Sequence, residues 1–337
     1  MNLDCGKSAM GEQVSKAKLR VVLTRRWPES VEQAMAEYFD LRINHENRAM
    51  TDEELGEALG WADVLCPTVT DGITAELLSA SHVKTQLLAN FGVGFNHIDM
   101  GAADQAGIKV TNTPGVLTDA TAEIALTLLL NTARRASEGE RLVRSGEWAG
   151  WHPTHMLSTQ VTGKTLGIIG LGRIGLAFAR QAHFGLGMPI LYSGRGPKSG
   201  HVLGGLPARY CGLEELLEQS DFVSLHCPAS EQTRHLINSE TLALMKPEAH
   251  LINTARGDVV NESDLVRALS SGVIAGAGLD VYEAEPRLAK GLVELANVVL
   301  LPHMGSGTTQ TRVAMGECAL ANIRAFAAGE PLLNQVG

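Results

Sequence analysis

Three glycines with the spacing Gly-x-Gly-x-x-Gly lie at the centre of the sequence. They follow the β-branched run at 165–169 and open a segment with helical periodicity. In such a unit of strand, turn and helix, the glycines allow a tight turn, a close approach of the backbone to a pyrophosphate, and packing of the helix on the sheet. Amides at the helix N-terminus attract the phosphate charge, so we expect a bound dinucleotide. Its predicted contacts here are Gly170, Leu171, Gly172, Arg173, Ile174 and Gly175.

The end of the next strand indicates which dinucleotide binds. No acidic residue occurs between Gly175 and Glu214, so the carboxylate that accepts the ribose 2′-hydroxyl of NAD is missing. A hydroxyl and two cations stand there instead, and these groups can hold a 2′-phosphate. The sequence therefore predicts NADP(H) rather than NAD(H), although the two cations could also be a solvated surface pair. The predicted contacts at this position are Ser193, Gly194, Arg195 and Lys198.

Short apolar runs alternate with helical patterns along most of the chain. This alternation predicts an α/β protein with doubly wound parallel sheets. A length of 337 residues exceeds what one hydrophobic core usually serves, so we expect two domains. The strands expected in the first domain are 19–23, 64–66, 87–89 and 109–111, and the helices expected between them are 29–40 and 52–60.

A long helix separates the two series of strands. The apolar periodicity predicts one unbroken helix over 119–144, followed by six parallel strands of a dinucleotide-binding domain. A last helix is expected over about 305–327, with no strand after it. The six expected strands are 165–169, 189–192, 221–225, 249–252, 275–279 and 297–300.

Composition excludes several other classes of protein. The net charge of −9 is spread along the chain without a basic stripe, which argues against a nucleic-acid partner. No apolar run approaches the roughly 18 residues of a membrane span, and the N-terminus lacks a secretory signal. We expect a cytoplasmic protein without a membrane segment. Neither disulfides nor a metal site are indicated by the spacing of the cysteines, which are Cys5, Cys66, Cys211, Cys227 and Cys318.

Several motifs in order resemble one known family. The segments LINTARGDVVNESDLVRAL, GAGLDVYEAEP and LLPHMGSGT, with NFGVGFNHID at 90–99 and VTNTPGVLTDATAEIAL at 110–126, are similar to the D-isomer-specific 2-hydroxyacid dehydrogenases from about residue 19 onward. The resemblance implies a flavodoxin-like substrate domain, a Rossmann cofactor domain, and reduction of a small 2-oxo acid. The expected division is a disordered tail at 1–17, a substrate domain of 18–116 with 305–337, and a cofactor domain of 117–304.

The resemblance also implies a catalytic set. The arginine of the family falls on Arg256, its glutamate on Glu285 and its histidine on His303. A protonated histidine is a suitable general acid for the carbonyl oxygen, which gathers negative charge as hydride arrives. A neighbouring carboxylate favours the charged imidazole, and the forked guanidinium of an arginine can hold the substrate carboxylate and polarise its carbonyl.

Further contacts follow from the same resemblance. The backbone amides of Val93 and Gly94 are expected to bind the substrate carboxylate, and Asp280 to accept a hydrogen bond from the nicotinamide carboxamide. His97 and Asp99 are expected to be structural. The implied substrate contacts are Val93, Gly94, Trp151, Arg256, His303 and Ser306. The implied further cofactor contacts are Cys227, Pro228, Thr233, Thr254, Ala255, Asp280, His303 and Gly305.

Three segments point to a subgroup of the family. SGRGPKS, PHMGSGT and GEWAGWHP at 146–153 most resemble the glyoxylate and hydroxypyruvate reductases. In that subgroup a tryptophan at the position of Trp151 enters the substrate site of the neighbouring subunit, which implies a homodimer. Simple packing of Trp148 and Trp151 is an alternative.

Two alternative functions stay open at this stage. One is a D-lactate-type or other dehydrogenase of the same family. The other is a dinucleotide-sensing module like the corepressor relatives of this fold, which would bind cofactor yet reduce glyoxylate negligibly.

Overall fold

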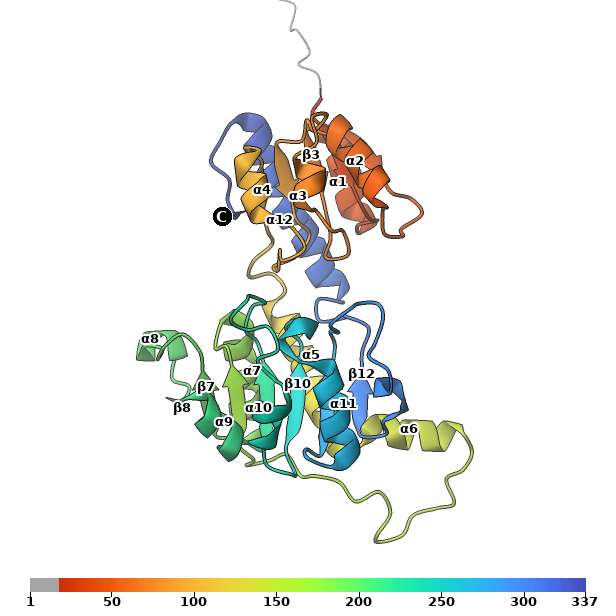
Figure 1. Cartoon of the computed structure of the whole chain (residues 1–337), viewed down its shortest axis with the longest axis vertical. Coiled ribbons are helices and arrows are strands. Elements are labelled where there is room, and N and C mark those ends of the chain that lie inside the picture. Colours follow the sequence, from red (N-terminus) through yellow and green to blue (C-terminus); the bar gives the residue numbers. More distant parts are fainter. Residues whose placement is uncertain (1–17) are drawn as a thin grey trace, which may run out of the picture. The chain divides into compact units, whose positions relative to one another are not determined.

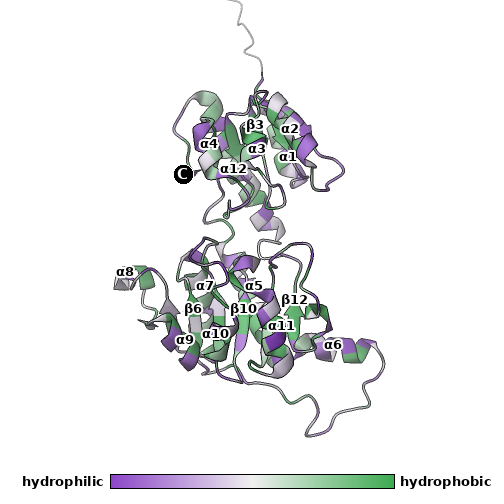
Figure 2. Ribbon diagram, in the orientation of Figure 1, coloured by the Kyte–Doolittle hydropathy of each residue, from purple (hydrophilic) through white to green (hydrophobic). Residues whose placement is uncertain are grey.

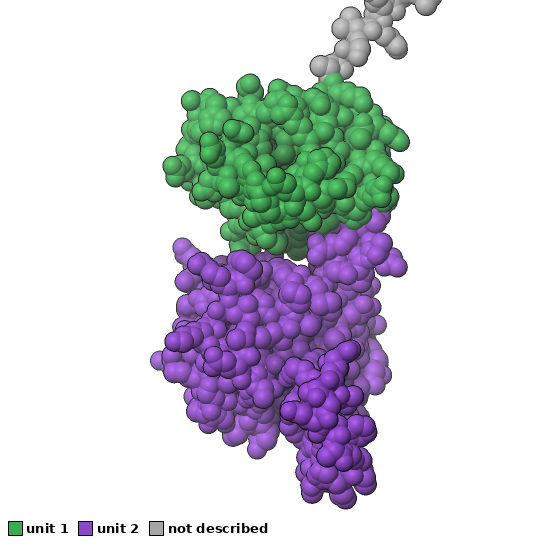
Figure 3. Space-filling view, turned by 90° about the vertical axis from the view of Figure 1, so that its right-hand side faces the viewer, with its two compact units in different colours: residues 1–112, 316–337 green, residues 113–315 purple. Residues whose placement is uncertain are grey.

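Two compact units make up the part of the chain that this computed structural model describes, residues 18–337 (Figure 3). Unit 1 extends to Asn112 and includes Gly316–Gly337, and unit 2 is Thr113–Met315. The assignment of one unit to the substrate and the other to the cofactor stays a prediction. The tail expected at 1–17, with Cys5, lies outside the described residues.

Unit 1 is built on a six-stranded sheet with the order β13-β5-β4-β3-β1-β2. All neighbours are parallel except β13, which runs antiparallel to β5. The buried aliphatic residues of the central strands form the core of the unit with the helices around them. The strands are β1 (Arg20–Leu23), β2 (Asp40–Ile43), β3 (Val64–Cys66), β4 (Leu87–Ala89), β5 (Lys109–Thr111) and β13 (Gln335–Val336).

The helices of unit 1 begin and pack in ways that the sequence explains. Thr51 and Glu54 form a reciprocal cap at the start of α2. Helix α12 begins in unit 2 and continues in unit 1, where Gly316 approaches Val31 so closely that a Cβ would lie 2.8 Å from its Cγ1. The helices are α1 (Glu29–Tyr38), α2 (Asp52–Trp61), α3 (Ala75–Leu78), α4 (Met100–Gln105) and α12 (Thr309–Ala328).

Unit 2 contains a seven-stranded, wholly parallel sheet with the order β12-β11-β10-β9-β6-β7-β8. The chain order reverses at β6, and open sheets of this kind bind ligands at the carboxyl ends of the strands near such a reversal. Figure 2 shows β6 and β12 in hydrophobic colours. The strands are β6 (Leu166–Ile169), β7 (Ile190–Ser193), β8 (Ala208–Tyr210), β9 (Phe222–Leu225), β10 (His250–Asn253), β11 (Gly276–Leu279) and β12 (Val298–Leu300).

Helices cover both faces of this sheet (Figure 1), and a hydrophobic core lies on each face. Residues of α5 and α7 bury one face, and residues of α9, α10 and α11 bury the other. The helices are α5 (Thr118–Arg134), α6 (Ala136–Arg144), α7 (Arg173–Leu186), α8 (Gly200–Leu203), α9 (Leu213–Gln219), α10 (Ser239–Ala243) and α11 (Glu262–Ser271), with short 3-10 turns at Gly257–Val259 and Leu292–Glu294. No helix among the described residues is long and apolar enough to cross a membrane.

The structure confirms both parallel sheets but corrects three expectations. The edge strands β2 and β8 were missed because their short sequences, DLRI and ARY, mix polar with apolar residues, and none of these residues is buried. The expectation that no strand follows the last helix was wrong, since β13 pairs with β5 through backbone contacts that two residues suffice to make. The second sheet, expected to have six strands, has seven because it includes β8.

The single helix expected over 119–144 is two helices. Arg135 takes a left-handed backbone (φ 54°) between α5 and α6, and the Asn131 side chain accepts the N–H of Ser137 at 2.7 Å. Arg135 also pairs with Glu138. These polar contacts end one helix and begin the next, while the apolar periodicity alone continues past the break.

Candidate active site

The turn after β6 requires glycine at two positions. Gly170 has φ 94°, and a Cβ on it would lie 2.6 Å from the backbone nitrogen of Cys227. A Cβ on Gly175 would lie 2.6 Å from the Gly170 carbonyl oxygen. Gly172 then caps α7, whose first amides emerge at the carboxyl edge of the sheet. This turn is the cradle that a pyrophosphate needs.

All the predicted site residues of unit 2 between Gly170 and Gly305 follow the carboxyl ends of parallel strands. Along the sheet they run from His303 after β12, through Asp280 after β11 and Arg256 after β10, to Gly170 after β6 and Ser193 at the end of β7. Since parallel strands end at one edge, the strand order itself places the acid–base candidates at one end of this row and the cationic residues near the other.

The residues after β7 present two cations to solvent. Arg195 and Lys198 are exposed, and neither forms an ion pair with another residue of the described chain. The backbone N–H of Lys198 donates to the Tyr192 hydroxyl at 2.7 Å, and the Tyr210 hydroxyl donates to the Gly194 carbonyl at 3.2 Å. The two tyrosines therefore hold the loop and leave both cationic side chains available to an anion.

The residues after β9 have a structural role, and the cysteine among them is not a nucleophile. Burial raises the pKa of the Cys227 thiol to about 11, so it stays protonated and is a poor nucleophile. The Thr233 hydroxyl donates to the Pro228 carbonyl at 2.7 Å, which closes the loop that follows. His226 is half-buried, and its burial lowers its pKa to about 3, so it is a neutral imidazole.

Arg256 follows β10 in a turn that Asn253 holds. The Asn253 side chain accepts the N–H of Ala255 at 3.0 Å and donates to the Arg256 carbonyl at 2.9 Å. Burial lowers the pKa of Arg256, while the charges of Glu285 and Asp258 raise it. The ordinary pKa of an arginine lies so far above neutral pH that the guanidinium remains charged. The turn therefore fixes a half-buried cation at the sheet edge.

Gly257 brings this turn against the segment after β11. A Cβ at Gly257 would lie 1.8 Å from the backbone carbon of Tyr282 and 2.3 Å from the nitrogen of Glu283. No side chain fits in that space, so only glycine lets the two backbones touch. The contact sets the distance between Arg256 and Glu285.

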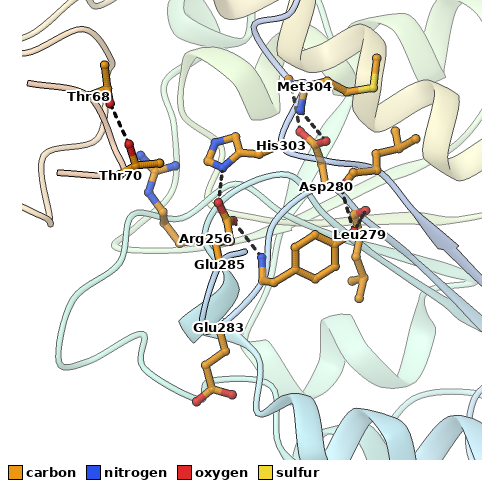
Figure 4. A network of polar contacts seen from close by, with 12 residues as sticks. Thr68, Thr70, Arg256, Leu279, Asp280, Glu283, Glu285, His303 and Met304 are labelled. Carbon is orange, nitrogen blue, oxygen red and sulfur yellow. Dashed lines mark hydrogen bonds and ion pairs between the residues drawn. The ribbon is translucent and has the colours of Figure 1, made fainter. Parts of the chain in front are cut away.

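His303 and Glu285 form a hydrogen-bonded pair. Figure 4 shows the Glu285 carboxylate pointing to the imidazole, with Nδ1 of His303 2.7 Å from Oε2. Burial alone would raise the pKa of Glu285, but the hydrogen bond and charge of His303, the Tyr282 amide and the charge of Arg256 outweigh it and hold that pKa below its usual range. Glu285 is therefore ionised at neutral pH, and Nε2 of His303 points away from it.

Asp280 holds the backbone that carries His303. Its two carboxylate oxygens accept the N–H groups of Met304 and Gly305, both at 2.7 Å, and its carbonyl accepts the N–H of His303 at 2.9 Å. His303 itself has a left-handed backbone (φ 53°), which costs free energy in a residue with a Cβ. The three hydrogen bonds keep it in that conformation.

Comparisons with known proteins agree with this arrangement. The model of the D-isomer specific 2-hydroxyacid dehydrogenase NAD binding domain matches residues 126–305. A glyoxylate reductase of Thermococcus litoralis is 45% identical over 319 residues, which cover 93% of this chain and 95% of that protein. The chain belongs to the D-isomer specific 2-hydroxyacid dehydrogenase family.

Solved structures of this family have the same fold. A putative D-isomer specific 2-hydroxyacid dehydrogenase from Polaromonas superposes with a TM-score of 0.88 at 38% identity, covering 95% of this chain and 100% of that one. An NADPH-dependent glyoxylate/hydroxypyruvate reductase from Sinorhizobium meliloti, in complex with NADP and malonate, gives a TM-score of 0.84 at 33% identity and covers 95% and 97%.

Membership of the family makes this chain an NAD(P)-dependent dehydrogenase with a nicotinamide dinucleotide as cofactor. The residues of unit 2 fit such a group. The side-chain-free cradle at Gly170 and Gly175 accepts a pyrophosphate, and the buried Thr254 hydroxyl has no hydrogen-bond partner among the described residues. A ligand at the sheet edge could supply that partner.

The remaining predicted substrate contacts lie elsewhere in the dehydrogenase. Val93 and Gly94 are in unit 1, where their carbonyls accept amides of Asn112 and Asn90 at 2.9 and 3.0 Å. Ser306 lies beyond His303, and its carbonyl accepts Nε of Arg312. Trp151 is 79% exposed in the loop after α6.

Three asparagines that support the site were not expected from the sequence. Asn90 follows β4 and Asn112 follows β5, while Asn253 ends β10, and each is buried with its amide bonded to a backbone turn. Their position directly at a strand end was a usable signal, since asparagine side chains often bond the backbone of a following turn. Asp99, expected to be structural, caps α4 by accepting the N–H of Ala102.

Proposed function

We propose that this dehydrogenase reduces glyoxylate, hydroxypyruvate or a similarly small 2-oxo acid to the 2-hydroxy acid, with a preference for NADPH. The observation that carries the proposal is the His303–Glu285 pair beside the half-buried Arg256 at the carboxyl edge of the sheet. The glyoxylate reductases among its relatives support the choice of substrate. Turnover of glyoxylate by the purified chain tests it.

The proton step belongs to His303. When bound, the reduced nicotinamide supplies the hydride. Nδ1 of His303 is occupied by the Glu285 carboxylate, so Nε2 is the atom that donates a proton to the carbonyl oxygen. The hydrogen bond from Nδ1 to Glu285 fixes the orientation of the imidazole ring. In oxidation of the hydroxy acid, the neutral imidazole takes the proton back.

Arg256 orients the substrate in this account. Its guanidinium presents donors in a fixed fork that matches a carboxylate and can also reach the neighbouring carbonyl oxygen. The cation stabilises the negative charge that gathers on that oxygen. The amides of Val93 and Gly94 are proposed as further donors to the substrate carboxylate.

The cofactor preference rests on Arg195 and Lys198, and one variant tests it. Replacement of Arg195 by alanine should raise KM for NADPH about tenfold and leave KM for NADH within about twofold, because only NADPH has a 2′-phosphate for the cation to hold. Steady-state kinetics with both cofactors measures this. Arg209→Ala, an exposed arginine of β8 paired with Glu215, is the control. Equal effects of Arg195→Ala on both cofactors would contradict the preference.

A homodimer is proposed for the assembly. Helix α6 buries none of its residues, and the loop after it exposes Trp148 (52%) and Trp151 (79%). Exposed tryptophans beside a helix without buried residues are typical of a surface that a second copy of the chain covers. The mass of the purified chain in solution tests this, and a monomer at micromolar concentration would contradict it.

A further inference from the structure

The segment that carries Glu285 is held from behind by a second glutamate. Glu262, the first residue of α11, is only 5% exposed. One of its carboxylate oxygens accepts the N–H of Glu283 at 2.7 Å, and the other accepts the N–H of Ala289 at 3.1 Å. These two amides bracket Glu285 along the chain. We propose that Glu262 is a positioning residue for the reduction, which holds Glu285 in place against His303.

The contact between Glu262 and Glu283 is reciprocal. The side chain of Glu283 accepts the N–H of Glu262 at 3.4 Å through Oε2, while its Oε1 lies 2.6 Å from Nε2 of His235. Figure 4 shows Glu283 pointing away from His303 and Glu285 pointing toward it. The segment is therefore anchored to α11 on the side opposite to the imidazole.

Anchoring at residue 283 fixes the direction of Glu285. The other oxygen of Glu285, Oε1, accepts the N–H of Tyr282 at 3.0 Å, and the backbone of Tyr282 rests on Gly257. The segment is thus held at Gly257, at Glu262 and at Ala289. Without Glu262, two of the amides that flank Glu285 lose their acceptor, and the carboxylate is free to leave Nδ1 of His303.

Helix α11 does not need Glu262 as its cap. Asn261 already caps the helix by accepting the N–H of Asp264 at 3.1 Å. Burying a carboxylate is costly unless its oxygens are hydrogen-bonded, and those of Glu262 are satisfied by the 283–289 segment. Burial and the charges of Glu283 and Glu285 raise the pKa of Glu262, while the two amides lower it. The buried carboxyl group thus serves the segment rather than the helix.

A double-mutant cycle between Glu262 and Glu285 tests the proposal, which rests on the proposed function. Glu262→Ala should lower kcat at least tenfold and leave Kd for NADPH unchanged. In a Glu285→Gln background the same change should alter kcat by less than about twofold, because Glu262 acts through Glu285. The loss should fall on kcat rather than on KM for glyoxylate, since a displaced Glu285 no longer orients the imidazole that donates the proton.

Asp264 provides a matched control on the same helix. It is 8% exposed and accepts a backbone N–H, that of Ser239 at 2.9 Å, but does not contact the 283–289 segment. Asp264→Ala should leave kcat and KM for glyoxylate near those of the unchanged chain. If Glu262→Ala does not fold, Glu262→Gln takes its place in the cycle, because its amide keeps one acceptor oxygen, and a smaller loss of kcat is expected.

The outcomes separate this inference from the proposed function. Equal losses of kcat in Glu262→Ala and Asp264→Ala, or losses that multiply in the double variant, would overturn the positioning role. An unchanged kcat in Glu285→Gln alone would instead remove Glu285 from the proposed mechanism. A loss in Glu285→Gln with no further loss on changing Glu262 supports both.

Discussion

Replacement of His303 by alanine is expected to lower kcat by about a hundredfold or more, while Kd for the cofactor stays near that of the unchanged chain. The imidazole is the only proton donor that the proposed mechanism uses, and Glu285 holds it by Nδ1 at 2.7 Å with Nε2 directed away. The alanine side chain cannot donate a proton, but the change leaves the dinucleotide-binding turn after β6 intact. Steady-state kinetics and a fluorescence titration with NADPH measure the two quantities.

His183 gives a control for the loss of an imidazole. It lies on α7, and its Nδ1 is 2.9 Å from the Met188 carbonyl, away from the sheet edge that carries the site. His183→Ala should keep kcat within about twofold. If His303→Ala kept the kcat of the unchanged chain, His303 would have no part in the proton step.

Replacement of Arg256 by lysine is expected to lower kcat/KM about a hundredfold, although the charge is conserved. Two charge-assisted hydrogen bonds to a carboxylate are worth about 1.5–3 kcal/mol each, and lysine cannot make both in the geometry of the fork. Asn253 and Gly257 fix the turn on either side of Arg256, so the backbone cannot move to compensate for the shorter reach. Both KM for the 2-oxo acid and kcat should change, since the arginine acts on the ground state and on the developing charge.

The matched control for this change is Arg135→Lys. Arg135 also presents a forked guanidinium to a carboxylate, that of Glu138, but at the break between α5 and α6. Its replacement should leave kcat/KM within about twofold. A kcat/KM in Arg256→Lys that matched the unchanged chain would show that no bidentate contact to the substrate exists.

The parts of the fold that depend on burial could be predicted from the sequence. Strands such as β6 and β9 are buried on both faces, so they read as continuous apolar runs. The edge strands β2, β8 and β13 could not be predicted, because backbone pairing at a sheet edge imposes no hydrophobic pattern. The break at Arg135 was hidden for a similar reason, since the side-chain contacts of Asn131 determine it.

The candidate site divides in the same way. The turn at Gly170 and Gly175 has a local pattern, because the lack of a Cβ is required at each position. The residues that hold Glu285 in place have no local sequence pattern. Glu262 and Glu283 are distant in sequence and meet only when α11 packs beside the end of β11. A glutamate in the first turn of a helix is common, so its sequence position alone gives no sign of the contact.

The central claim is hydride transfer to a small 2-oxo acid, and one measurement tests it directly. The purified full chain is mixed with glyoxylate and with NADPH that carries deuterium at the transferred position, and the product is examined by mass spectrometry. We expect oxidation of NADPH that depends on glyoxylate, with one deuterium on C2 of the glycolate formed. Binding of NADPH without any oxidation in the presence of glyoxylate, hydroxypyruvate or pyruvate would contradict it and favour a dinucleotide-sensing module.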